Sequence, residues 1–260
     1  MPALKIGIQL ASLRMPLRQA LPVAARLGAT GVEINARTEL PGGELSHTGV
    51  LQIRKLLEDL NLKVIAVSYP TRRGYNVAEE LDRRVAGTKA AMKLAHDLGA
   101  HVVINHVGRI PEKSEGADWQ MLLDVLGDLG RHGMHVGARL AADTGSASGP
   151  DLAWLLASLP EQSIGVNFNP GQLIVNDFSA QEAIEALSSS ILHVHAEDGV
   201  RDIARGRGVE VELGRGSADF PSLLGALEEQ GYRGYITVLR HNSADPVSDL
   251  GNAIRFLRSL

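Results

Sequence analysis

The strongest constraint on the fold is a regular alternation, repeated along the whole chain, between short β-rich runs and segments with helical periodicity. The runs predict eight strands, at Lys5–Leu10, Gly31–Asn35, Lys63–Ser68, His101–His106, Val136–Ala142, Ile164–Phe168, Ile191–His195 and Tyr235–Leu239. Strands that alternate with helices form parallel βα units, and 260 residues suit eight such units. The sequence therefore predicts an α/β fold, a single (β/α)8 TIM barrel domain over residues 1–260.

Helix signals support this prediction. One apolar stripe at helical spacing is formed by Leu81, Val85, Thr88, Met92 and Ala95. Gly99 is a typical C-terminal stop, and Asp245-Pro246 is typical of an N-cap followed by proline at the first helical position. A doubly wound open sheet is the competing fold, but no Ser/Pro-rich linker divides the chain and the alternation persists to the terminus.

Composition excludes several classes of protein. The formal net charge is -4 and the lysines and arginines are scattered, whereas a nucleic-acid-binding protein concentrates basic residues on one face. The apolar runs are too short for a membrane span, and no signal-peptide hydrophobic region precedes the first strand. Without cysteine the chain forms neither disulfides nor thiolate ligands. We expect a cytoplasmic protein. The sequence does not decide whether the chain forms a homo-oligomer.

The predicted seventh strand carries unusual polar side chains. His193 and His195 share one face, and Glu197 follows at the same period of two. Ionisable groups are costly in a core strand unless they are paired, and α/β proteins place their functional groups at the carboxyl ends of strands. The alternative is a pair of core histidines that backbone groups satisfy.

Other predicted strands also end in polar residues. These are Glu33 and Asn35, Asn105 and His106, Asp143, Asn167 and Asn169 with Gln172, and Arg240 with His241. Because the carboxyl ends of barrel strands meet at one face, we expect these side chains to line a pocket. Tyr69 and Tyr75, after the third strand, could close over a sugar ring or serve as packing residues.

Several strand ends resemble a known family. The matching segments are Asp143-Thr-Gly145, Asn169-Pro-Gly171, His193-Val-His195, Leu213-Gly-Arg-Gly216 with Asp219-Phe220, and Gly234-Tyr-Ile-Thr237. They resemble the sugar phosphate isomerase/epimerase family of xylose isomerase-like TIM barrels, whose relatives include ketose 3-epimerases and endonuclease IV. The resemblance covers the whole chain and implies a barrel that acts on a small sugar or sugar phosphate.

The resemblance also implies a metal site, from which this chain departs. The family holds one divalent cation between Glu, Asp, His and Glu, at the positions of Asp143, Asn169, His195 and Leu239. The family's four ligands carry three negative charges, whereas the four residues of this chain carry one. We therefore expect weak or absent binding of Mn²⁺ or Mg²⁺. His241 lies two residues beyond Leu239 and is a candidate replacement, as are Glu33 and His106.

Family enzymes move a proton next to a carbonyl, which requires a base and a group that holds the enediolate. Because Leu239 replaces one glutamate, a shuttle between two glutamates is not expected. A one-base scheme remains, with Asp143 or Glu33 as the base and His195 or His106 polarising the oxygen.

Substrate contacts are expected from several side chains. The family places a substrate arginine six residues after the histidine, at Arg201, and a histidine at the position of Gln172. The expected set is Arg201, His106, Asn169, Gln172, Tyr69 and Arg72. Arg201, Arg205, Arg207 and Arg215 form either a phosphate site or a solvated, salt-bridged loop.

We therefore expect a sugar, sugar-phosphate or keto-acid isomerase or epimerase with an altered metal site; a related elimination or hydration is also compatible. The alternative is a catalytically degenerate barrel that binds a sugar or a protein partner without turnover. Phosphodiester cleavage in the manner of endonuclease IV needs a multi-metal His/Glu cluster and a cationic face, and neither is visible.

Overall fold

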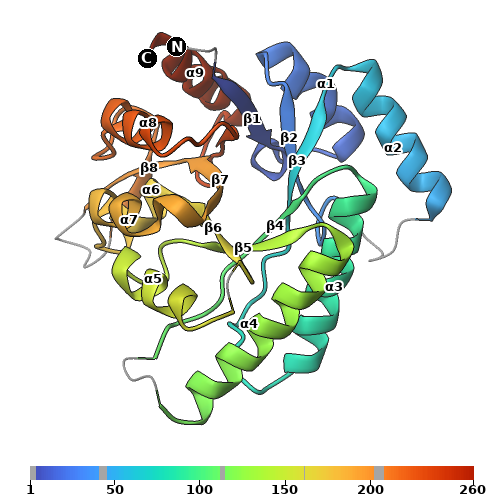
Figure 1. Ribbon diagram of the computed structural model, residues 1–260. Helices are drawn as coiled ribbons and strands as arrows, with labels where there is room; N and C mark the ends of the chain where they lie inside the picture. The colour runs from blue at the N-terminus through green and yellow to red at the C-terminus, as the bar shows by residue number, and fades with distance from the viewer. Residues whose placement is uncertain (1–3, 41–45, 112–114, 161, 202–207) are drawn as a thin grey trace.

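Eight parallel strands close into one barrel in the computed structural model (Figure 1), which describes residues 4–40, 46–111, 115–160, 162–201 and 208–260. The barrel strands are β1 (Lys5–Gln9), β2 (Gly31–Asn35), β3 (Lys63–Ser68), β4 (Val102–Asn105), β5 (Arg139–Asp143), β6 (Gly165–Phe168), β7 (Ile191–Ala196) and β10 (Tyr235–Val238). Neighbours pair in the order β1-β10-β7-β6-β5-β4-β3-β2. This confirms the predicted (β/α)8 barrel.

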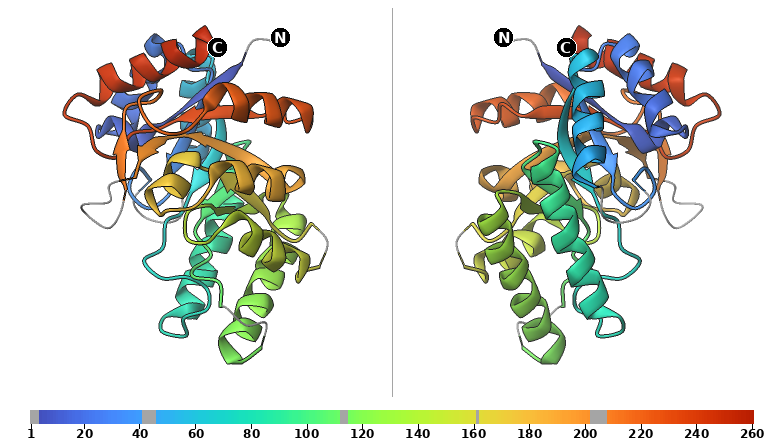
Figure 2. Two further views of the ribbon diagram at one scale, coloured as in Figure 1. Left: turned by 90° about the vertical axis from the view of Figure 1, so that its left-hand side faces the viewer. Right: turned by 90° about the vertical axis from the view of Figure 1, so that its right-hand side faces the viewer.

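Helices connect the strands and cover the outside of the barrel (Figure 1). They are α1 (Leu17–Leu27), α2 (His47–Asp59), α3 (Leu81–Asp97), α4 (Ala117–Val136), α5 (Gly149–Ala157), α6 (Pro170–Val175), α7 (Ala180–Leu187), α8 (Phe220–Glu229) and α9 (Pro246–Ser259), with short 3₁₀ turns η1 (Leu10–Leu13) and η2 (Ser188–Ser190). Figure 2 shows α3 and α4 packed side by side. Within the described residues, no helix is both long and apolar enough to cross a membrane.

The helix signals in the sequence have the expected structural roles. Thr88, Met92 and Ala95 are buried on α3. At the start of α9, the Asp245 side chain accepts a hydrogen bond from the backbone N–H of Ser248, as an N-cap residue does.

Six of the predicted strands have different limits in the structure, and β4 and β5 differ most. β4 excludes both His101 and His106. β5 begins only at Arg139, because Val136 is the last residue of α4 and Gly137 ends that helix with a φ of 80°. Glycine adopts this left-handed conformation without the steric cost that a side chain brings.

A small antiparallel sheet, β8 (Asp198–Val200) with β9 (Val209–Val211), follows β7 and was not predicted. The buried carboxylate of Asp198 holds this region together, since it accepts hydrogen bonds from four backbone N–H groups, those of Gly199, Gly214, Gly216 and Ala218. Asp198 therefore has a structural role beside the barrel mouth, and the sheet brings Glu210 to the loop that follows β10.

Glu39, in the turn after β2, is half-buried, and within the described residues its carboxyl has one hydrogen bond, which its Oε2 accepts from the backbone N–H of Asn35 at 2.6 Å. Burial raises its pKa from 4.5 to about 7. Since the folded state holds this proton more tightly than the unfolded chain, Glu39 makes stability fall as the pH rises from about 4.5 to about 7.

We expect Glu39→Gln to stabilise the protein by about 1–2 kcal/mol near pH 8 and to change little near pH 5, because the amide keeps the acceptor and removes the buried charge. Urea unfolding at the two pH values measures this difference. Glu58→Gln, at an exposed position on α2, is the matched control and should have no pH-dependent effect. An equal effect of Glu39→Gln at both pH values would contradict the argument.

Candidate functional site

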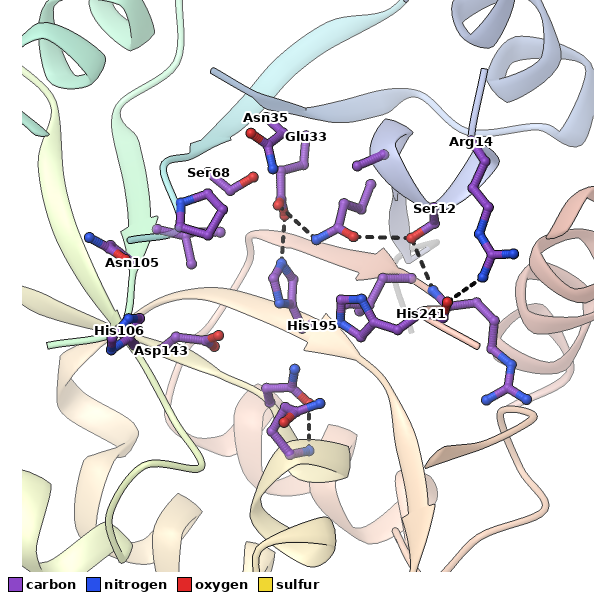
Figure 3. A pocket seen from close by; sticks show the side chains of 18 residues that line it. Ser12, Arg14, Glu33, Asn35, Ser68, Asn105, His106, Asp143, His195 and His241 are labelled. Atoms are coloured by element: carbon purple, nitrogen blue, oxygen red, sulfur yellow. Dashed lines mark hydrogen bonds and ion pairs between the residues drawn. The ribbon is translucent and has the colours of Figure 1, made fainter. Parts of the chain in front are cut away.

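A pocket of about 370 Å³ opens at the carboxyl ends of the barrel strands (Figure 3). Its walls include eleven residues that the sequence analysis singled out: Glu33, Asn35, Asn105, His106, Asp143, Asn169, Gln172, His195, Leu239, Arg240 and His241. They come from six different strand ends, as a barrel active site does.

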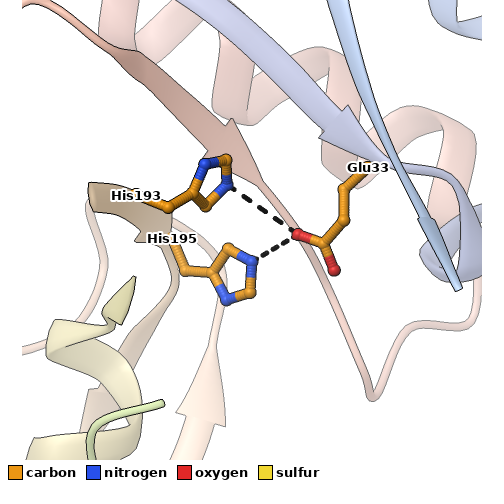
Figure 4. Close-up of side chains that lie close together, drawn as sticks. All are labelled: Glu33, His193 and His195. Carbon is orange, nitrogen blue, oxygen red and sulfur yellow. Dashed lines mark hydrogen bonds and ion pairs between the residues drawn. The ribbon is translucent and has the colours of Figure 1, made fainter. Parts of the chain in front are cut away.

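A chain of hydrogen bonds crosses the floor of this pocket. The Nε2 of His195 lies 2.5 Å from the Oε2 of Glu33, across the barrel (Figures 3 and 4). The Nδ2 of Asn167 lies 2.9 Å from the Nδ1 of His195 and 2.7 Å from the Oδ1 of Asp143. The amide of Asn167 therefore joins the two groups that the sequence analysis proposed as an acid/base pair.

Electrostatics hold Glu33 and His195 as an ion pair near neutral pH. Burial alone would raise the pKa of Glu33, but the charge of His195 and its hydrogen bond outweigh burial and lower the pKa to about 2. Burial alone would lower the pKa of His195, but the Glu33 carboxylate raises it to about 8. The Gln9 Nε2 donates to the other Glu33 oxygen at 3.0 Å, so both carboxylate oxygens are engaged.

Asp143 differs from Glu33 because its surroundings favour the neutral acid. Burial raises the pKa of Asp143, and the charge of His195 and the hydrogen bond from Asn167 only partly oppose this. A carboxyl with a raised pKa beside a pocket is a stronger base, once ionised, than an ordinary aspartate, which suits acid/base chemistry.

His193 precedes His195 by two residues on β7, so it lies farther from the carboxyl end of that strand, where the pocket opens. Its Nε2 is buried, has no hydrogen-bond partner in the described part of the chain and lies 3.9 Å from the Oε2 of Glu33. Burial lowers the pKa of His193 to about 3, so the ring is neutral. The alternative of two core histidines satisfied by backbone groups does not hold, since His195 is bonded to side chains and this nitrogen of His193 is unpartnered.

Glu197 organises the amides that follow β6. Its buried carboxylate accepts hydrogen bonds from the Nδ2 of Asn169 at 2.7 Å and from the Nε2 of Gln172 at 2.6 Å. The Oδ1 of Asn169 accepts the backbone N–H of Gln172 as the N-cap of α6. Both polar atoms of the Asn169 side chain are therefore already bonded.

His106 and His241 lie on the pocket wall. The Nε2 of His106 lies 2.5 Å from the carbonyl oxygen of Thr71, an arrangement in which the ring donates and its Nδ1 stays available. His241 is half exposed, and its Nε2 lies 3.9 Å from the Oε2 of Glu197.

Three predicted substrate contacts lie outside the pocket lining. Arg201 is exposed, and its Nε lies 2.9 Å from the Oδ1 of Asp177. Tyr69 packs against the core beneath the guanidinium of Arg37, which lies 5.5 Å from the ring centroid. Arg72 is exposed.

The remaining loop expectations have different outcomes. Tyr75 is fully buried, where its hydroxyl hydrogen-bonds Thr88 and Asn105, so it does not close over a ligand. Arg215 pairs with Glu212 at 3.2 Å, as in the salt-bridged alternative. Arg205 and Arg207 lie outside the described residues.

The sequence analysis missed the contribution of the first strand. Gln9 at the end of β1, and Ser12 and Arg14 in and after η1, all line the pocket. The Oγ of Ser12 donates to the Oε1 of Gln9 at 3.0 Å and accepts the backbone N–H of Arg240 at 3.0 Å. The strand-end rule that found the other residues, when applied to β1, would have found Gln9 and Ser12.

The family model for xylose isomerase-like TIM barrels matches residues 21–260 of this chain. The chain belongs to this family. A search of curated proteins found no match.

Solved structures agree with this xylose isomerase-like barrel. A xylose isomerase domain protein from Planctomyces limnophilus is similar with a TM-score of 0.89 and 25% identity, over 99% of this chain and 97% of that chain. The 3-keto-D-glucoside 4-epimerase of E. coli is similar with a TM-score of 0.75 and 16% identity, over 99% of this chain and 100% of that chain. The IOLI protein, solved with a zinc atom, is similar with a TM-score of 0.79 and 16% identity, over 98% of each chain.

The residues of this xylose isomerase-like barrel do not fit a divalent cation at the position that the resemblance implies. Leu239 offers no donor atom, and the side-chain oxygen of Asn169 caps α6. The Nδ1 of His195 and one oxygen of Asp143 are bonded to Asn167. One free carboxylate oxygen, on Asp143, is left where the family supplies three carboxylates.

A different cluster has metal-ligand atoms close together. Within the described residues, one group of three has ligand atoms within 4.8 Å of one another, and it comprises Glu33, His193 and His195 (Figure 4). It lies in the barrel interior at the floor of the pocket, which Glu33 and His195 line, and a hydrogen bond already joins these two members.

Proposed function

We propose that this protein is a sugar or sugar-derived keto-acid isomerase that transfers a proton next to a carbonyl without a cation at the usual family position. The observation that carries the proposal is the chain Glu33–His195–Asn167–Asp143 on the pocket floor. Both carboxylate oxygens of Glu33 are hydrogen-bonded, whereas one oxygen of Asp143 is available. The epimerase among the structural relatives shows that this fold can host chemistry of this class.

Asp143 is the base in this scheme. Its free oxygen removes the proton from the carbon beside the carbonyl, which leaves an enediolate and a protonated Asp143. The same carboxyl then returns the proton to the neighbouring carbon. The second proton transfer runs between the two oxygens: the Nδ1–H of His195 protonates the former carbonyl oxygen, and the same nitrogen then takes the proton of the neighbouring hydroxyl, which becomes the new carbonyl. Because one base works on one face of the substrate, this arrangement favours aldose–ketose isomerisation over epimerisation, which needs a proton donor on the opposite face.

His195 stabilises the oxygen of the enediolate. In the protonated ring both nitrogens are donors, so Nε2–H bonds Glu33 and Nδ1–H needs an acceptor on the Asn167 side of the ring. With the amide of Asn167 turned over, its oxygen, otherwise unpartnered among the described residues, accepts this proton in the resting site, and the substrate oxygen competes for it. Glu33 is then a positioning residue that holds the ring and its charge. We therefore favour Asp143 over Glu33 as the base.

Activity without bound metal is the direct test. Protein purified without chelator is soaked in Mn²⁺, its metal content is measured by elemental mass spectrometry, and a second sample is treated with EDTA. Both are then assayed by NMR for deuterium uptake from solvent beside the carbonyl in a panel of ketoses and keto acids. We expect substoichiometric metal and equal exchange in both samples.

Stoichiometric metal together with loss of exchange after EDTA would refute the metal-independent scheme. In that case His193→Gln distinguishes the two sites, because only the cluster with Glu33 and His195 requires the His193 side chain. Retention of metal in this variant would assign the usual family position.

The second candidate is a barrel that binds a sugar without turnover. The buried, apolar Leu239 in the pocket wall favours it, since this residue removes the second carboxylate of the family mechanism. A thermal-shift screen against the same panel distinguishes the two functions. Compounds that stabilise the protein but never exchange deuterium would support binding alone.

A further inference from the structure

The pocket contains an arginine whose charge no carboxylate balances within the described residues. Arg14 follows η1 and lines the pocket (Figure 3). Its Nη1 donates to the carbonyl oxygen of Ser243 at 2.9 Å, and its Nη2 donates to the carbonyl oxygen of His241. Both acceptors are neutral, so they do not compensate the positive charge of the guanidinium. Three of its five N–H groups remain for a ligand.

The other arginine of the pocket wall is neutralised. The Nη1 of Arg240 lies 3.4 Å from the Oε2 of Glu210, and its Nε lies 3.4 Å from the Oδ2 of Asp249. Arg240 thus has two acidic partners and Arg14 has none among the described residues. This difference identifies Arg14 as the cation that is available to an incoming anion.

The loop that holds Arg14 is itself fixed by the unpredicted sheet. The Glu210 side chain, on β9, accepts the backbone N–H of His241 and the backbone N–H of Asn242, each at 2.8 Å. With its N–H groups turned toward β9, the loop presents carbonyl oxygens to Arg14. The guanidinium is therefore held in place before a ligand arrives, which lowers the entropic cost of binding.

The backbone of Arg14 is also in an unusual conformation. Its φ is 54°, in the left-handed region that disfavours residues with a side chain. The backbone N–H of Arg14 donates to the carbonyl oxygen of Ala11 at 3.2 Å, which closes the turn. Such conformations concentrate at ligand-binding sites, where the surrounding structure maintains them.

We propose that Arg14 binds an oxyanion of the substrate, so that the substrate class is a sugar that carries a phosphate or a carboxylate. Figure 3 shows Arg14 and His241 on one side of the pocket and Asp143 and His106 on the other, with His195 between them. A substrate with its anion at Arg14 would present its carbonyl carbons to Asp143. This orientation rests on the proposed function, whereas anion binding at Arg14 does not.

Binding of simple anions tests the inference directly. Isothermal titration calorimetry with inorganic phosphate and with gluconate gives the Kd for the wild-type protein and for Arg14→Gln. We expect the variant to bind the preferred anion at least tenfold more weakly, since a guanidinium–oxyanion contact is charge-assisted. Tighter binding of phosphate would assign a phosphate ester, and tighter binding of gluconate would assign a sugar acid.

Two further variants separate charge from structure. Arg18→Gln, at an exposed position on α1 outside the pocket, should leave the Kd unchanged. Arg14→Lys keeps the charge and should restore part of the affinity, which loss of loop structure would not allow. An unchanged Kd in Arg14→Gln, or no difference between Arg14→Gln and Arg14→Lys, would overturn the inference.

The outcome is independent of turnover. Wild-type protein that binds an anion through Arg14 but exchanges no deuterium would support this inference and contradict the proposed function. Deuterium exchange on a neutral sugar that is unaffected by Arg14→Gln would support the proposed function and contradict this inference.

Discussion

Replacing Asp143 by asparagine is expected to lower turnover by about 10²–10⁴-fold, the usual contribution of a positioned acid or base. The asparagine keeps an oxygen that accepts the hydrogen bond from Asn167 at the position where Asp143 accepts it at 2.7 Å, so the pocket should stay intact. Only the proton-accepting oxygen is lost. Deuterium uptake beside the substrate carbonyl measures the loss, and the Kd of a bound sugar should change less than threefold.

Two variants provide the controls for this experiment. Asp124→Asn, on the exposed face of α4, should leave turnover unchanged. Asp143→Glu retains a carboxylate on a longer side chain and should recover part of the exchange. In the wild-type protein, burial raises the pKa of Asp143, so the acid limb of the pH–rate profile should lie above the ordinary aspartate range. Full turnover in Asp143→Asn would exclude this residue as the base.

The fold could be predicted from the sequence because each strand and most helix ends carry a local signal. The short apolar runs overlap all eight barrel strands, and Asp245 caps α9 as expected. The sheet of β8 and β9 carried no such signal. Its strands are three residues long and contain Asp198 and Glu210, so their pairing depends on tertiary contacts rather than on hydrophobic periodicity.

The candidate site was predictable in part, for a similar reason. Residues at the carboxyl ends of strands, such as Glu33 and His195, converge because the barrel closes. Loop residues follow no such rule. Arg201 has the family spacing, yet it pairs with Asp177 on the surface, and Arg14 reaches the pocket because the carbonyl oxygens of a distant loop hold it. Spacing along the chain does not encode contacts of this kind.

Glu33→Gln is expected to destabilise the protein by about 3 kcal/mol near pH 6, because it removes one partner of a buried ion pair. The effect should depend on pH. The low pKa of Glu33, about 2, contributes stability that is present above about 4.5 and is lost as the pH falls toward 2. The raised pKa of His195 contributes stability that is present below about 6.5 and is lost as the pH rises through about 8.

Both contributions are therefore complete between about pH 5 and 6.5, and the penalty of Glu33→Gln should be largest there and smaller near pH 9. Urea unfolding at the two pH values measures it, with the exposed Glu58→Gln as the control. NMR titration of the His195 ring gives a second readout, in which its pKa should fall from about 8 once the Glu33 carboxylate is gone, because only the smaller coulombic effects of Asp143 and Glu197 then oppose burial. A pH-independent penalty, or an unchanged His195 titration, would show that Glu33 does not hold this charge and would remove its positioning role from the proposed mechanism.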